Sequence, residues 1–127
     1  MSYHFTKKFD GSFEEATAAV IAALADQGFG VLTEIDVRAT LKKKLDVDFR
    51  PYTILGACNP RLAYQALQHE GKIGAMLPCN IVVQETDDGV EVSAVDPAAS
   101  MQAIENAELE SVAGEARAKL RAVIDSL

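Results

Sequence analysis

The sequence has no tryptophan, only two cysteines and no long run of apolar residues. A helix that crosses a membrane needs roughly 20 predominantly apolar residues, and no stretch approaches that length. The start of the chain, MSYHFTKKFDG, alternates polar and apolar residues and lacks the apolar core of a secretory signal. These absences predict a cytoplasmic protein without membrane association and with reduced thiols; a Cys58–Cys79 disulfide stays open as an alternative.

Basic residues are also scarce, with 12 Lys and Arg against 19 Asp and Glu and a formal net charge of −7. Nucleic-acid binding depends on basic side chains that displace counterions from phosphates. The basic run Lys42–Lys44 is short and has acidic neighbours. We therefore expect no nucleic-acid partner.

The composition that remains is that of an ordinary globular protein, 49% hydrophobic and 24% charged. A chain of 127 residues with no linker and no low-complexity tract predicts one domain over residues 1–127.

Alternation and capping signals predict the first half of the fold. Residues 3–9 alternate as a strand does, and Ser12 with Glu15 forms a capping box that starts a helix ending at Gly28. A second strand is expected over residues 29–35. Asp36 then caps a short helix whose apolar positions Val37, Leu41 and Leu45 are spaced four apart, and a third strand runs over about residues 49–57.

The second half starts with a helix at Asn59, a good N-cap, followed by Pro60 at the first helical position. KIGAMLP is expected to be a loop or a short extended piece. IVVQET and VEVSAV then form a hairpin around Asp88-Gly89. Helix resumes after Asp96-Pro97 with an apolar stripe to the C-terminus, and one long helix or two shorter ones both fit.

The expected order is β-α-β-α-β-α-β-β-α(α), in which strands alternate with helices before a final hairpin. This pattern predicts an α/β (α+β) two-layer sandwich with a mixed sheet of about five strands.

The two cysteines have similar neighbours, GACNP at residues 56–60 and LPCN at residues 77–80. If the third and fourth strands are antiparallel neighbours, Cys58 and Cys79 meet at one end of the sheet. Asn59, Pro60 and Asn80 would then lie nearby. Glu34 and Asp36 would join them if the short helix makes a parallel crossover. A helix N-terminus beside Cys58 favours the thiolate form of a cysteine.

Each of these residues also has an ordinary structural role. Free cysteine packs as a small apolar group, Asn59 caps a helix, Asn80 ties down a loop and prolines shape turns. The two interpretations are evenly matched, and only the pairing of the two motifs favours a functional site.

The sequence does not match common metal or cofactor motifs. There is no Cys-x-x-Cys, phosphate-binding loop, dinucleotide fingerprint or nucleophile elbow. A metal site would need more ligands, and only His4, His69 and Met76 are candidates for that role. We therefore expect no metal and no cofactor.

The stretch from GFGVLTEID through GACNP, with LPCNIVVQE and VDP after it, resembles the domain of unknown function 302 (DUF302) family of bacteria and archaea. The resemblance covers about residues 9–127. It implies a two-layer α/β fold and a homodimer, and it assigns no activity. Its motifs include Thr33, Glu34, Asp36, Cys58, Asn59, Pro60, Pro78, Cys79 and Asn80.

Three functions remain open from the sequence. The first is a binding or carrier domain for a small molecule or thiol-reactive species at Cys58 and Cys79. The second is a non-enzymatic dimeric interaction module in which both cysteines are structural. The third is a thiol redox or sulfur-transfer enzyme with Cys58 as nucleophile and Cys79 as resolving group, although no catalytic base is visible.

Overall fold

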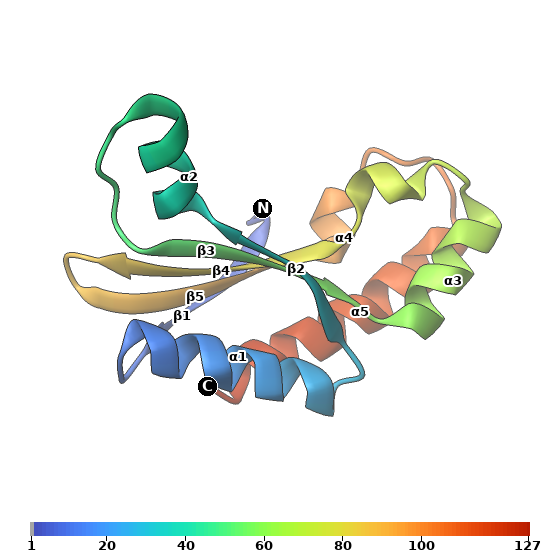
Figure 1. Cartoon of the computed structure of the whole chain (residues 1–127). Helices are drawn as coiled ribbons and strands as arrows, with labels where there is room; N and C mark the ends of the chain where they lie inside the picture. Colours follow the sequence, from blue (N-terminus) through green and yellow to red (C-terminus); the bar gives the residue numbers. More distant parts are fainter. Residues whose placement is uncertain (1) are drawn as a thin grey trace.

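The computed structural model describes residues 2–127 and contains strands and helices in the expected order (Figure 1). The strands are β1 His4–Phe9, β2 Gly30–Asp36, β3 Tyr52–Cys58, β4 Cys79–Thr86 and β5 Gly89–Val95. The helices are α1 Phe13–Asp26, α2 Val37–Leu45, α3 Pro60–His69, the 3₁₀ helix η1 Ile73–Met76, α4 Pro97–Ser100 and α5 Glu108–Asp125.

The five strands form one sheet in the order β1-β5-β4-β3-β2, and every neighbouring pair is antiparallel. The predicted α/β fold class and five strands are confirmed. The expectation of a mixed sheet is wrong, because β2 returns to β3 antiparallel. Helix α2 therefore makes no parallel crossover.

Helices α1 and α5 cover one face of the sheet and build the main core with it (Figure 1). Their buried stripes include Val20, Leu24 and Leu120, which pack against Leu55 and Ile81 of the central strands. Burial of such aliphatic side chains stabilises a fold by about 1.5–3 kcal/mol each. The opposite face of the sheet stays partly exposed, as is common for antiparallel sheets.

The predicted helix starts are confirmed. Ser12 and Glu15 form both hydrogen bonds of the capping box. Asp36 accepts from the backbone N–H of Ala39, and Asn59 accepts from that of Leu62. Each bond satisfies an amide that a helix N-terminus leaves free.

Two segments differ from expectation or resolve an open question. KIGAMLP contains the 3₁₀ helix η1, whose Ile73 is fully buried. The C-terminal segment forms two helices, α4 and α5, where a single one had stayed open. Asn106 lies between them and accepts a hydrogen bond from the backbone N–H of Glu108.

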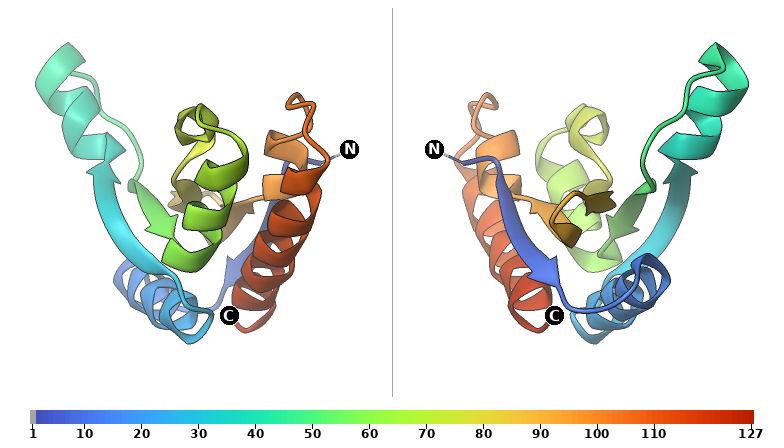
Figure 2. Two further views of the ribbon diagram at one scale, coloured as in Figure 1. Left: turned by 90° about the vertical axis from the view of Figure 1, so that its right-hand side faces the viewer. Right: turned by 90° about the vertical axis from the view of Figure 1, so that its left-hand side faces the viewer.

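Helix α2 stands apart from the core. It contributes no buried residue, and Leu45 on its apolar side is 66% exposed. Figure 2 shows β2 and α2 at one side of the molecule and α5 at the other, with α3 between them. Helix α3 packs instead with α5 and η1 in a second cluster of buried apolar residues that includes Leu62, Ile73 and Met101.

Candidate functional site

An apolar cavity of about 320 Å³ lies between α3, α5 and the adjoining ends of β3 and β4. Both cysteines line it, and most of the remaining wall is aliphatic. Leu62 comes from α3, Leu77 from the segment before β4, and Val112 from α5. Among residues 2–127, no charged side chain lines this cavity, and apart from the two thiols the only polar side chain at its wall is that of Asn59.

Strand pairing explains how the two cysteines reach the same cavity. β3 ends at Cys58 and β4 begins at Cys79, and Ala57 is the register partner of Cys79. The sequence placed the two cysteines at one end of the sheet only on the condition that these strands are antiparallel neighbours. β3 and β4 do pair antiparallel, and this brings the ends of both motifs together. Both cysteines are free; Cys58 is partly exposed and Cys79 is buried.

The surroundings of Cys79 keep its thiol protonated. Burial, and secondarily the nearby Cys58, raise the pKa of the Cys79 thiol to about 11. An apolar environment disfavours the thiolate because it removes the water that would solvate the charge. At neutral pH, Cys79 therefore contributes a neutral, polarizable sulfur to the cavity wall.

Asn59 links the cavity to the rest of the fold through both ends of its side-chain amide. Its Oδ1 accepts from the N–H of Leu62 at 3.3 Å, and its Nδ2 donates to the carbonyl oxygen of Gln27 at 3.3 Å. The residue is 8% exposed. These contacts fix the start of α3 against the end of α1, and Pro60 follows as the first residue of α3, exposed to solvent.

Asn80 lies outside the cavity. It is exposed, pairs in register with Gly56, and lines a hollow on the open face of the sheet. Side chains alternate between the two faces of a strand, so Asn80 faces away from the side that Cys79 faces. The likeness between the two motifs therefore does not extend to their asparagines.

Glu34 and Asp36 are also not brought to the cysteines. Because β2 runs antiparallel to β3, it is Gly30, at the start of β2, that pairs with Cys58. Glu34 pairs with Leu55 and Asp36 with Thr53, further along the sheet. Both carboxylates are exposed, and Asp36 serves as the N-cap of α2.

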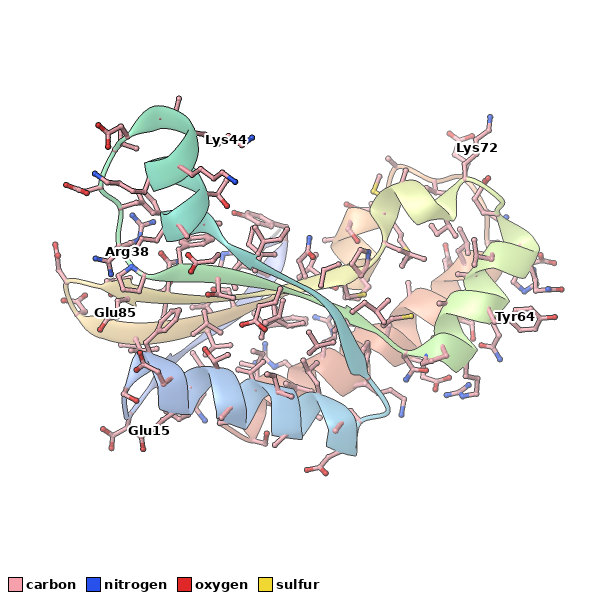
Figure 3. All side chains as sticks on the ribbon, in the orientation of Figure 1. Glu15, Arg38, Lys44, Tyr64, Lys72 and Glu85 are labelled. Carbon is pink, nitrogen blue, oxygen red and sulfur yellow. The ribbon has the colours of Figure 1, made fainter. Side chains whose placement is uncertain are left out.

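Two polar contacts, one of them an ion pair, join α3 to α5, which forms the facing wall of the cavity. Arg61 binds Glu115 near the start of α3, and this lowers the pKa of the Glu115 carboxyl. Near the other end, His69 Nδ1 lies 2.7 Å from Glu108 Oε2. The outward side of α3 carries Tyr64, which points away from the sheet (Figure 3).

Sequence reasoning missed several cavity residues, including Met101, Leu77 and Val112. Val112 belongs to the apolar stripe of the C-terminal helix, and such a stripe does not separate residues in close contact from residues that border a cavity. Met101 falls within the helical segment that is expected after Asp96-Pro97. No pattern in the sequence indicates that Met101 lies near the cysteines.

A second hollow, of about 560 Å³, lies on the open face of the sheet. Several of its polar side chains bond to one another. Thr6 Oγ1 lies 2.6 Å from His4 Nδ1 and 2.8 Å from Ser93 Oγ, and Gln84 Nε2 donates to Glu91 Oε1 at 3.2 Å. These groups resemble the solvated face of a sheet, so the apolar cavity is the better candidate site.

Every helix within residues 2–127 is too short or too polar to cross a membrane.

Comparison with known proteins places the chain among relatives of the same fold. No curated protein matches it. A crystal structure of an uncharacterized conserved DUF302 protein from Bacillus stearothermophilus matches with a TM-score of 0.92 and 27% sequence identity, over 98% of each chain. The family model for the domain of unknown function DUF302 matches residues 5–127, so the chain belongs to the DUF302 family.

Proposed function

We propose that this protein is a binding or carrier domain for a small, uncharged and largely apolar molecule. The ligand would occupy the cavity between α3, α5 and the sheet, with Cys58 and Cys79 on its wall. The observation that carries this proposal is a cavity of about 320 Å³ that is lined by both thiols and by no charged side chain of the described residues, 2–127. Ligand pockets typically enclose about 300–1,000 Å³ and are mostly apolar.

The lining selects against charged ligands. A carboxylate or phosphate in this cavity would lose its hydration without a cationic partner, which is costly. The amide of Asn59 already bonds to Leu62 and Gln27. An aromatic or aliphatic molecule needs no such partner, and its burial is favourable in proportion to the apolar area removed from water.

The cavity favours binding over catalysis. A cysteine nucleophile reacts as the thiolate, and it is activated by a neighbouring base or by a lowered pKa. In the part of the chain that the structure describes, no imidazole or carboxylate lines the cavity, and the pKa of the Cys79 thiol is raised. The two free thiols are compatible with a reducing compartment such as the cytoplasm.

Fluorescence titration with the uncharged dye N-phenyl-1-naphthylamine tests this proposal. We expect saturable binding of one dye per chain. Ala63 lines the cavity from α3, so Ala63→Phe fills space that the dye needs and should abolish binding. Gln65 is exposed on the same helix and does not line the cavity, so Gln65→Phe is the matched control. Equal dye binding by the two variants would contradict the proposal.

A second candidate function is self-association into a homodimeric interaction module. Apolar side chains are exposed along β2, α2 and the turn after it: Ile35 is 46%, Leu45 66% and Val47 43% exposed. Contiguous exposed apolar surface commonly marks a protein interface. The family resemblance suggests that a second copy of this chain covers this surface. Dimerisation there is compatible with ligand binding in the cavity.

A further inference from the structure

Strand β2, at the edge of the sheet, contains one extra residue, Leu32. Val31 pairs with Ala57 of β3. Thr33 pairs with Gly56, the next residue of β3, so Leu32 has no register partner. Val31 packs against the main core, whereas Thr33 lies over Gly56 on the opposite face. Regular alternation would place Val31 and Thr33 on one face, so this is a β-bulge, a feature that often re-aims a side chain next to a functional site.

The bulge residue stands at the opening of the apolar cavity. Leu32 lines the cavity and is 68% exposed, and Leu67 of α3 also lines it and is 47% exposed. A residue that belongs to a cavity wall and also meets solvent lies where the cavity opens. The mouth therefore lies between β2 and α3, which stand apart in Figures 1 and 2.

The interior of the cavity offers no good partner for a polar group. Almost all of the surface that residues 2–127 contribute to it is apolar, and thiols are weak hydrogen-bonding groups. The amide of Asn59 is bonded at both ends. No buried side-chain nitrogen or oxygen within residues 2–127 lacks a hydrogen-bond partner. A hydroxyl inside the cavity would lose its bonds to water without replacing them, which is costly.

The mouth, in contrast, suits the junction between an apolar chain and a polar end. Leu32 and Leu67 offer apolar contact to the last carbons of a chain, and the solvent that reaches them can hydrate a polar group. At about 320 Å³ the cavity is near the lower end of the range for ligand pockets. This size favours a small amphiphile over a larger lipid.

We propose that the ligand is a small uncharged amphiphile of the medium-chain alcohol class, with its tail in the cavity and its polar end in the mouth between Leu32 and Leu67. This inference rests on the proposed function, because it names the class and the orientation of the molecule in the same cavity. The bulge makes Leu32 a specificity-determining residue, which contacts the ligand where the tail meets the polar end.

Displacement of N-phenyl-1-naphthylamine by 1-octanol and by 1,8-octanediol tests the orientation. Octanol can leave its one hydroxyl in solvent, whereas the diol must bury a hydroxyl to fill the cavity. We expect the diol to bind about tenfold or more weakly than octanol. 1-Heptanol should bind about fourfold more weakly than octanol, because one methylene fewer is buried.

A lysine at the mouth tests where the polar end lies. Octanoate carries a charge where octanol carries its hydroxyl, so Leu32→Lys should raise the affinity for octanoate relative to octanol several-fold at low ionic strength. Leu45, 66% exposed on α2 and outside the cavity, provides the matched control: Leu45→Lys adds the same charge and should leave this ratio unchanged. Both ligands compete with the same dye, so their ratio does not depend on how a variant binds the dye.

Two results would overturn the proposal: equal displacement by octanol and octanediol, or equal octanoate-to-octanol ratios in the two lysine variants. Either result, with dye binding by the wild type intact, leaves the proposed function standing. Absence of dye binding by the wild type would overturn both. Circular dichroism checks folding, and if Leu32→Lys does not fold, Leu67→Lys at the same mouth takes its place.

Discussion

The side chain of Asn59 donates a hydrogen bond to the backbone carbonyl of Gln27 and so joins the start of α3 to the end of α1. The same residue caps α3 and borders the cavity. Asn80, its counterpart in the second motif, is exposed on the other face of the sheet.

The two asparagines should therefore differ sharply in their effect on stability. Asn59→Ala removes a helix cap and leaves the Gln27 carbonyl without this partner, so we expect the free energy of unfolding to fall by about 1–2 kcal/mol. Asn80→Ala should change it by less than about 0.5 kcal/mol. Urea denaturation followed by circular dichroism measures both, and equal losses would be inconsistent with the described roles.

Gly56 should not tolerate a side chain. A Cβ atom at this position would overlap Thr33 Oγ1 and would lie 2.8 Å from Pro78 Cγ. We expect Gly56→Ala to destabilise the fold by about 1–3 kcal/mol, because the overlap forces neighbouring groups to shift. Adding Thr33→Ala should recover part of this loss.

Gly114 provides the control for that substitution. It lies within α5, and a Cβ there would meet no atom within 4 Å. Gly114→Ala should raise the free energy of unfolding by up to about 1 kcal/mol, since alanine favours helix. A neutral Gly56→Ala would show that the close packing of Thr33 over Gly56 is absent in solution.

The protonation of Cys79 predicts a loss of stability at high pH. Its folded-state pKa, about 11, lies above the ordinary thiol value of 9.0. The unfolded chain thus releases this proton first as pH rises. The contribution of Cys79 to the free energy of unfolding is fully present below pH 9.0 and is lost as pH rises toward 11. The expected loss is at most roughly 2–3 kcal/mol.

Denaturation of the wild type and of Cys79→Ala at pH 7.5 and at pH 10.5 (about 3 units apart) measures this contribution by difference. We expect the free energy of unfolding of the wild type to fall more than that of the variant over this interval. Parallel changes in the two proteins would mean that Cys79 titrates as an exposed thiol does.

The exposed apolar residues of the β2–α2 region predict self-association. If a second copy covers them, Leu45→Glu should shift the protein toward the monomer, because burying a carboxylate in an apolar interface is costly. Sedimentation equilibrium measures the mass. Ile21, 39% exposed on α1, provides the control: Ile21→Glu should leave the association unchanged. A wild-type monomer at all concentrations would exclude this dimer.

Local signals explain why most elements are predictable from the sequence. The caps at Ser12, Asp36 and Asn59 act within a few residues, so the sequence shows where these helices begin. Once β3 and β4 are antiparallel neighbours, the end of β3 lies beside the start of β4, so both cysteines border one cavity.

The orientation of β2 and the shape of the cavity could not be predicted. The spacing of Val37, Leu41 and Leu45 is the same whether α2 packs on the sheet or stands away from it. Only tertiary structure decides between a parallel crossover and an antiparallel return. Likewise, an apolar stripe on α5 does not show where packing leaves space, so the cavity wall at Val112 and Met101 is visible only in the structure.

The most direct test of the central claim, that the cavity binds small apolar molecules, is a methyl-resolved NMR titration with naphthalene. The account predicts saturable shifts of the methyl signals of Leu62, Met101 and Val112, which lie at the cavity. The signals of Ile54 and Val82, in strands β3 and β4 outside it, should stay in place. Unchanged cavity methyls, or shifts confined to Ile54 and Val82, would contradict it.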